Sequence, residues 1–207
     1  MDSHHLHPEP DRISKFWAWF LEHRTDLVPE KASKSTIADL EEHLFAIHRL
    51  DWEIGPGHLA PNLFALSPRG DRQALEITRG IVALAPKLSD WEFYPAKPPR
   101  SWSLVFNLNV GTKSVTIDGK RWEFVAYKFD DGTYDLMLKP DNPAGLSAEY
   151  LNLAATIIVD GEIGEENRID RVGNIELVTS WDEDAAKYSR ILEPGLLASV
   201  AKRSGNQ

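Results

Sequence analysis

The acidic segment between positions 160 and 166 is the densest group of chemically active side chains in this sequence. Its four carboxylates are Asp160, Glu162, Glu165 and Glu166. Such a group could hold a hard cation or act as an acid–base pair. The hypothesis that follows is a hydrolase or lyase whose carboxylate site involves Glu162, Glu165 and Glu53. The ligand spacing of a calcium loop is absent, and acids at a helix C-terminus oppose the helix dipole. A solvated turn is the competing interpretation.

The seven histidines form no zinc or catalytic motif. His43 and His48 are five positions apart on one predicted helix and do not share a face, as ligands four apart would. His4, His5 and His7 could chelate Ni²⁺ or Cu²⁺ loosely in an N-terminal tail, which we interpret as incidental. We therefore predict no metal site and no cofactor.

Motifs for nucleophilic and phosphate chemistry are also missing. The sequence has no cysteine, which excludes disulfides, thiolate metal sites and cysteine catalysis. It has no Gly-x-Ser-x-Gly elbow. Gly55-Pro56-Gly57 is not followed by Gly-Lys-Ser/Thr, and Pro56 has no N–H to offer a phosphate. The sequence therefore assigns no catalytic residue.

The charge balance is acidic, with a formal net charge of −9 from 23 Lys and Arg against 32 Asp and Glu. A nucleic-acid binder neutralises phosphates with basic side chains, so we predict no nucleic-acid partner. An acidic surface instead speeds encounter with a basic protein. No apolar run reaches the roughly 18 residues of a membrane span, and residues 1–11 have no apolar core of a signal peptide. The expected location is the cytoplasm.

Tryptophan is abundant, with seven residues in 207. Core packing is the expected role of Trp17, Trp52, Trp91 and Trp122. Trp19 and Trp102 fit the apolar stripes least well, and exposed Trp is a common hot spot at protein interfaces. These two residues are therefore candidates for binding a partner.

The elements that must position these side chains begin with two helices. Ile13, Phe16 and Phe20 follow helical spacing, and Pro29 lies beyond the end of that helix. A second apolar stripe runs from Ile37 to Ile47, with Thr36 as the expected capping residue.

A strand-strand-helix-strand pattern then occurs twice, at 52–94 and at 122–178. The copies open with similar tripeptides, Trp-Glu-Ile and Trp-Glu-Phe. We expect an α+β fold whose sheets are mainly antiparallel, with the helices on one face. Asp71 and Ser147 are the expected caps of the two helices, and Gly161 and Gly164 are candidate stops. Asp118-Gly119 predicts a β-hairpin turn before the second copy.

Two prolines mark the predicted boundary between the copies, since Pro98-Pro99 cannot join a central ladder. We expect a flexible tail at 1–10, a first part at 11–97, and a second part at 101–201 that ends in a helix. The alternative is one compact domain.

An ordered set of short motifs resembles a family of uncharacterised bacterial proteins known as a domain of unknown function. The resemblance spans roughly Ile13 to Val178, and it implies a bacterial origin and an α+β fold, with no activity attached. The motifs are Phe16-Trp17-Ala18-Trp19-Phe20, Ile54-Gly55-Pro56-Gly57, Leu66-Ser67-Pro68 with Gly70, Ala85-Pro86-Lys87-Leu88-Ser89-Asp90-Trp91-Glu92-Phe93, Lys97-Pro98-Pro99 and Gly161-Glu162-Ile163-Gly164-Glu165.

The leading functional hypothesis is a non-enzymatic protein-binding or regulatory module. One concrete version is an immunity-like protein that caps a basic toxin, by analogy with other small acidic proteins. The expected contact surface contains Glu162, Glu165 and Glu166, exposed just beyond a helix, with Trp19 and Trp102 as further binding residues. The alternative is the carboxylate-dependent hydrolase or lyase. The sequence predicts no oligomeric state.

Overall fold

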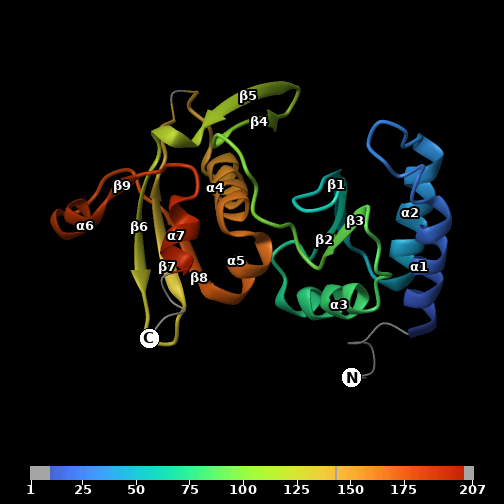
Figure 1. The fold of residues 1–207 in the computed structure, drawn as a ribbon. Helices are drawn as coiled ribbons and strands as arrows, with labels where there is room; N and C mark the ends of the chain where they lie inside the picture. Colours follow the sequence, from blue (N-terminus) through green and yellow to red (C-terminus); the bar gives the residue numbers. More distant parts are fainter. Residues whose placement is uncertain (1–9, 143, 203–207) are drawn as a thin grey trace, which may run out of the picture. The chain divides into compact units, whose positions relative to one another are not determined.

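A computed structural model describes residues 10–142 and 144–202 of the chain (Figure 1). The chain divides into two compact units, one of residues 1–97 and the other of residues 98–207, and each is described by itself. The chelating hypothesis for His4, His5 and His7 lies outside the described residues. None of the described helices is both long enough and apolar enough to cross a membrane.

The first unit begins with two helices, α1 (Pro10–His23) and α2 (Lys34–Ile47). Helix α1 includes Pro10, which the sequence assigned to the tail. The cap of α2 is Ser33, whose Oγ accepts the backbone N–H of Thr36 at 3.1 Å. The expectation that Thr36 caps this helix is therefore wrong. Ser33 offers the same hydroxyl chemistry three residues earlier, which leaves Thr36 inside the first turn.

The sheet of the first unit has the strand order β1-β2-β3. Strand β1 is antiparallel to β2, and β3 is parallel to β2. The helix between β2 and β3 is capped as expected, because an Asp71 carboxylate oxygen accepts the N–H of Ala74 at 2.7 Å. The elements are β1 (Asp51–Pro56), β2 (Asn62–Ser67), α3 (Arg72–Ala83) and β3 (Trp91–Tyr94).

One apolar cluster joins helices α1, α2 and α3 to one face of the sheet of this unit. Ile54, Phe64 and Phe93 lie opposite one another across the three strands, so their side chains share that face. The Trp17 indole N–H donates to the carbonyl of Ile81 at 2.9 Å, which ties α1 to α3. The fully buried residues of the cluster include Phe16, Phe20, Leu40, Leu44, Phe64, Leu66 and Ile81.

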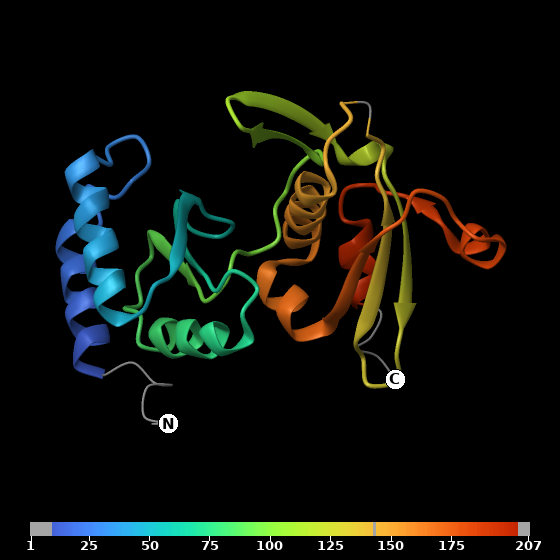
Figure 2. The same ribbon diagram turned by 180° about the vertical axis from the view of Figure 1, so that it is seen from behind.

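The second unit contains the remaining strands and helices (Figures 1 and 2). They are β4 (Val105–Val110), β5 (Lys113–Asp118), a 3-10 turn (Gly119–Arg121), β6 (Glu123–Lys128), β7 (Tyr134–Lys139), α4 (Ala148–Ile163), α5 (Glu165–Arg171), β8 (Val172–Leu177), α6 (Glu183–Tyr188), β9 (Arg190–Ile191) and α7 (Leu196–Lys202).

The two units share the order and the sense of their strand pairings. Strand β6 is antiparallel to β7, and β8 is parallel to β7, as β1, β2 and β3 are in the first unit. The expectation of mainly antiparallel sheets is confirmed in part: the β4-β5 sheet is antiparallel, but each of these two sheets also contains one parallel pairing. A helical crossover returns the chain to the end of the sheet at which the preceding strand began. The strand after the helix therefore runs parallel to the strand before the helix.

The hairpin that precedes β6 turns at a different place from the one expected. Strands β4 and β5 pair antiparallel, and the turn between them contains Gly111, whose φ is 60°. Gly119 instead donates its N–H to the carbonyl of Leu104 at 2.8 Å and opens the 3-10 turn that leads into β6. The Asp118-Gly119 hairpin prediction is therefore wrong, since Gly111 supplies the positive φ that the tight turn needs.

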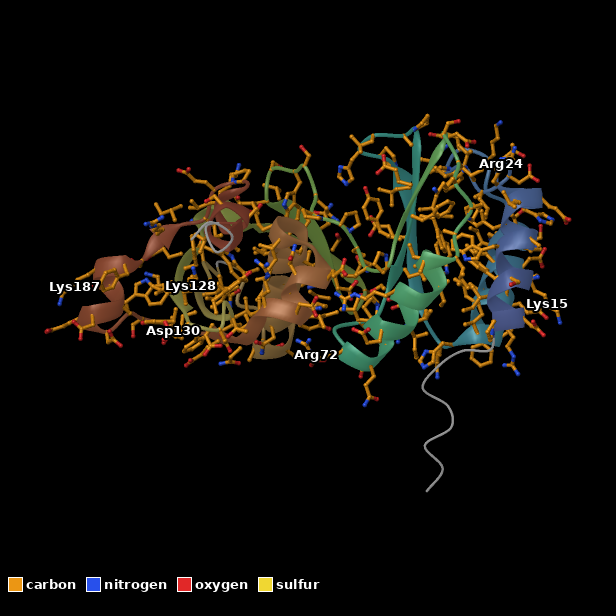
Figure 3. All side chains as sticks on the ribbon, turned by 60° about the horizontal axis from the view of Figure 1, so that its bottom comes forward. Lys15, Arg24, Arg72, Lys128, Asp130 and Lys187 are labelled. Carbon is orange, nitrogen blue, oxygen red and sulfur yellow. The ribbon has the colours of Figure 1, made fainter. Side chains whose placement is uncertain are left out.

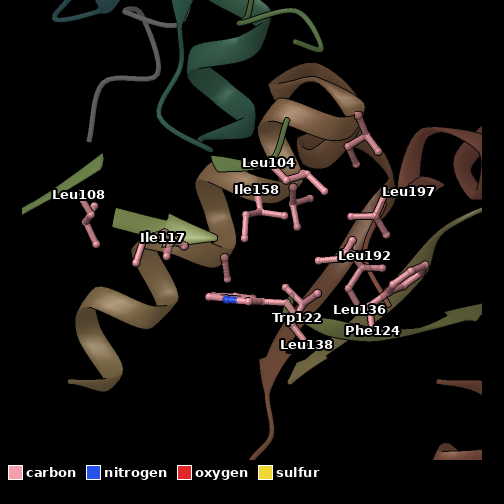
Figure 4. Close-up of a cluster of buried hydrophobic side chains, with 14 of the residues drawn as sticks. Leu104, Leu108, Ile117, Trp122, Phe124, Leu136, Leu138, Ile158, Leu192 and Leu197 are labelled. Atoms are coloured by element: carbon pink, nitrogen blue, oxygen red, sulfur yellow. The ribbon is translucent and has the colours of Figure 1, made fainter. Parts of the chain in front are cut away.

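A second apolar cluster joins helices α4 and α7 to the four-stranded sheet of the second unit, whose strand order is β8-β7-β6-β9 (Figure 4). It also includes Leu108 and Ile117 of the β4-β5 pair. Phe124, Leu138 and Leu177 lie opposite one another in β6, β7 and β8. Ile158 on α4 and Leu197 on α7 pack against this face. We call the side of the four-stranded sheet that carries Phe124, Leu138 and Leu177 its helix face. Strand β9 lies beside β6, and helix α6 projects outward beyond β9 (Figures 1 and 2).

Candidate functional site

Trp102 and Glu162, two of the predicted binding residues, are in direct contact. The chain just before β4 runs beside the last turns of α4, where the backbone N–H of Arg100 donates to the carbonyl of Gly161 at 2.7 Å. The indole N–H of Trp102 donates to Oε1 of Glu162 at 3.3 Å. The contact anchors this segment to α4.

Glu162 is a buried carboxylate, only 3% exposed. Its Oε2 has no hydrogen-bond partner among the residues that the structure describes. The expectation of an exposed acidic turn is therefore wrong at this position. Helix α4 continues to Ile163, so Glu162 lies within the helix, on a side that other atoms cover. A covered carboxylate is poorly placed to steer a partner through solvent.

The other carboxylates of the acidic segment are engaged within the protein. Glu165 is 2% exposed and lies 4.0 Å from Nη2 of Arg168, whose Nε–H donates to Asp160. Glu166 is half-buried, and it too has an interaction partner. In the described ranges, no group of three or more His, Asp or Glu residues is arranged to hold a metal ion.

The glycines of the Gly-Glu-x-Gly-Glu motif have a packing role. A Cβ on Gly161 would lie 2.4 Å from Cζ2 of Trp102, which is too close for any side chain. Gly164 ends α4, as expected, with a φ of 83°, and a Cβ there would lie 2.9 Å from Cδ of Pro99. Gly161, by contrast, lies inside the helix. Both glycines allow the chain at Pro99 and Trp102 to approach the junction of α4 and α5.

Trp19, the other predicted binding aromatic, is half-buried and stacked with two imidazole rings. The ring centroids of His23 and His43 each lie 4.7 Å from the indole. Nδ1 of each imidazole also donates a hydrogen bond to a backbone carbonyl, that of Trp19 for His23 and that of Asp39 for His43. The indole is thus already occupied by side chains of its own unit. Glu53, the third carboxylate of the hydrolase hypothesis, lies on β1 of the first unit.

The loop after β1 binds a carboxylate of its own unit. The backbone N–H groups of Leu59 and Ala60 donate to Glu92, and the Tyr94 hydroxyl donates to the same carboxylate at 2.5 Å. Burial opposes ionisation of Glu92, but these bonds and one from the His58 backbone outweigh it and lower its pKa to about 2. Burial and the bond to Glu92 raise the pKa of Tyr94 to about 12. Glu92 therefore occupies the N–H groups that an external anion would need.

The edge of β6 offers backbone groups of a different kind. Leu192 donates its N–H to the carbonyl of Trp122 at 2.9 Å, so the even-numbered residues of this strand direct their N–H and C=O groups toward β9. Phe129 bonds to Thr133 across the turn, so the odd-numbered residues face β7. Among the residues that the structure describes, strand β9 pairs only with Glu123 and Phe124. Past Phe124, β9 no longer pairs with β6, and the N–H and C=O groups of Ala126 and Lys128 point away from the sheet.

A groove of about 560 Å³ borders this open edge. Its floor and one wall are residues 124–128 of β6 with Val200 of α7, and its other wall is residues 187–190, from the end of α6 to β9. Three basic side chains line it, Lys128, Lys187 and Arg190, and none of its lining residues is acidic. Figure 3 labels Lys128 on β6 and Lys187 on α6, the two sides of this groove.

The alternation of strand residues places two of these cations on the same side of the sheet. Arg190 lies opposite Phe124 in the antiparallel pair, so the two side chains share the helix face. Lys128 is four residues beyond Phe124 and points to the same face. The tyrosines at the groove are solvent-exposed, 42% for Tyr127 and 69% for Tyr188. The groove therefore combines open hydrogen-bonding groups, aromatic surface and positive charge.

Sequence reasoning missed this groove. The run Lys187-Tyr188-Ser189-Arg190 and the pair Tyr127-Lys128 each combine basic and aromatic residues, which is the available signal. The two segments are about 60 positions apart, and neither alone is a basic cluster. Pairing of β9 with β6 brings them together.

Comparison with known proteins finds no matching family model, curated protein or solved structure. The resemblance to an uncharacterised bacterial family thus stays a prediction.

Proposed function

We propose that this chain is a protein-binding module that takes an extended segment of its partner as an added strand along β6. The observation that carries the proposal is the open edge at Ala126 and Lys128 beside a groove. Strand addition satisfies exposed main-chain donors and acceptors, and neighbouring pockets for alternate side chains supply specificity. An unpaired edge with aromatic neighbours is a template for such pairing.

The groove is also of a suitable size. Its volume of about 560 Å³ lies within the range of established ligand sites, which extends from about 300 to 1,000 Å³. Its lining includes Tyr127, Tyr188 and Arg190, and Tyr and Arg are residue types that are enriched at protein interfaces. A short edge of this length favours a peptide segment over a large flat partner.

The other hypotheses have less support from the geometry. The immunity-like version with a basic partner stays a prediction, but two of its expected contact residues, Glu162 and Glu165, are buried. The hydrolase or lyase alternative needs a cavity at its carboxylates. Neither of the two described pockets is lined by Glu53, Glu162 or Glu165.

A displayed library of random peptides, selected against the parent protein, tests the proposal. We expect the selected peptides to slow amide hydrogen exchange at Ala126 and Lys128, because both N–H groups enter a new ladder. Selected peptides that leave both amides unprotected would contradict strand addition.

The variant Ala126→Pro removes one of the two outward N–H groups without removing a bond to β7. We expect it to weaken the selected peptides by about tenfold, since Pro is tolerated where an N–H faces solvent but cannot donate to a new strand. Ala126→Thr is the matched control, because it keeps the N–H and suits a strand. Circular dichroism of both variants checks that the sheet persists. Equal binding by the proline variant would overturn the proposal.

A further inference from the structure

The charge of the groove narrows the chemistry of the partner. We infer that the segment added to β6 is acidic and carries two carboxylates on alternate residues, one opposite Lys128 and the other beside Arg190. This inference rests on the proposed function and deepens it.

The positive charge of the groove is local and available. The chain as a whole has a net charge of −9, yet all three charged residues that line the groove are basic. Lys187 is already paired with Asp184 at 2.8 Å, so it contributes little. Lys128 and Arg190 form no ion pair within the described part of the chain, and Arg190 is exposed. Two unneutralised cations beside open backbone groups favour an anionic segment.

The two acids of the turn after β6 lie outside the groove. Asp130 and Asp131 belong to the turn after β6, and the Asp131 carboxylate accepts hydrogen bonds from the backbone and hydroxyl of Thr133. Neither aspartate lines the groove. Asp130 and Asp131 therefore lie past the Lys128 end of the open β6 edge. There they disfavour a bound segment whose acidic residues extend past Lys128.

The geometry of the edge sets the spacing of the two carboxylates. A residue of the added strand opposite Lys128 shares its face, and so does the residue two positions along, opposite Ala126. The position opposite Ala126 lies in line with β9, whose Arg190 is opposite Phe124. The two positions are two strand residues apart, a distance of roughly 7 Å. A long arginine side chain spans this distance. Acids on adjacent residues would instead point to opposite faces of the sheet.

A second copy of this chain fits the edge less well. Pairing β6 of one copy with β6 of another would join two edges that both carry Lys128 and Arg190. Like charges placed opposite each other across strands are destabilising.

Three labelled peptides of nearly equal size test the inference by fluorescence anisotropy at low salt. The first is Thr-Val-Glu-Thr-Glu-Val-Thr, with its carboxylates on one face. The second, Thr-Val-Glu-Glu-Thr-Val-Thr, has the same composition with its carboxylates on opposite faces. The third replaces both Glu of the first with Gln. We expect the first to bind about tenfold more tightly than the third, with the second between them, and added salt to reduce the difference.

Charge-reversal variants locate the contact. Lys128→Glu and Arg190→Glu should each weaken the first peptide about tenfold and leave the Gln peptide nearly unchanged. Lys31→Glu and Lys113→Glu are matched controls, because these exposed lysines line neither described pocket. Equal losses in all four variants would overturn the inference, since they would report net charge alone.

Amide exchange at Ala126 and Lys128 separates this inference from the proposed function. Protection by the Gln peptide at equal affinity would leave strand addition standing and overturn the acidic specificity. Tight, charge-dependent binding that leaves both amides unprotected would overturn both. Protection that rises with protein concentration, without peptide, would identify a second copy as the occupant and overturn the inference.

Discussion

The indole N–H of Trp102 donates to Oε1 of Glu162 at 3.3 Å, and the other carboxylate oxygen of Glu162 has no partner in the described ranges. A buried polar group that loses its partner pays its full desolvation cost. Trp102 and Glu162, two residues that the sequence predicts to bind a partner, thus contact each other within the second unit.

Replacing Trp102 with Phe should lower the free energy of unfolding by about 1–3 kcal/mol, because Glu162 would keep its burial without any described hydrogen bond. Urea denaturation measures the change. Trp181→Phe is the matched control. It also removes an indole donor from a carboxylate, Glu123, but that group is half-buried and keeps its ion pair with Lys139 at 2.5 Å. Equal losses in the two variants would contradict a special cost at Glu162.

Gly161→Ala should destabilise the protein by about 1–3 kcal/mol, although Ala is normally the better helix former. The new Cβ would lie 2.4 Å from the Trp102 ring. The matched control is Gly80→Ala in α3, where nothing lies within 4 Å of the added carbon. That variant should stabilise the protein by about 0.5–1 kcal/mol. Thermal unfolding of both variants measures the contrast, and the same sign in both would refute the contact.

Amide hydrogen exchange in the free protein should alternate along β6. The N–H groups of Val125 and Tyr127 face β7 and should exchange slowly, whereas those of Ala126 and Lys128 should exchange fast. Exchange followed by nuclear magnetic resonance resolves the four amides. Uniform protection of all four would show that another segment covers this edge.

Glu92 should make stability depend on pH at the acidic end. Its pKa of about 2 in the folded protein lies below the ordinary value of 4.5. Its contribution is therefore fully present above about pH 4.5 and is lost as pH falls toward 2, because the unfolded chain binds the proton more tightly. The difference in unfolding free energy between the parent and Glu92→Gln should shrink across this window. A constant difference would show that ionisation of Glu92 is not linked to folding.

Tyr94 should act at the opposite end of the pH scale. Its pKa of about 12 lies above the ordinary value of 10. The stabilisation it supplies is thus present below about pH 10 and is lost as pH rises toward 12. Unfolding of Tyr94→Phe, compared with the parent from pH 9 to 11, measures this loss, which should be absent in the variant.

Local patterns in the sequence predict the helices and the repeated order of elements. The spacing of Phe16, Leu40 and Ile81 identifies faces that are buried in the structure, because helical periodicity depends only on neighbouring residues. The cap at Asp71 and the helix end at Gly164 follow in the same way from the chemistry of a few adjacent groups.

Contacts between distant segments decide the rest. The parallel pairing of β3 with β2, and of β8 with β7, depends on where each crossover helix returns the chain. No short sequence pattern reports that position. The burial of Glu162 requires Trp102, 60 positions away, to lie against α4. The groove exists because the two-residue strand β9 pairs with only the start of β6 and leaves Ala126 and Lys128 open. A strand of two residues has no sequence periodicity of its own. Only the folded chain therefore determines which part of the β6 edge is covered and which part is free.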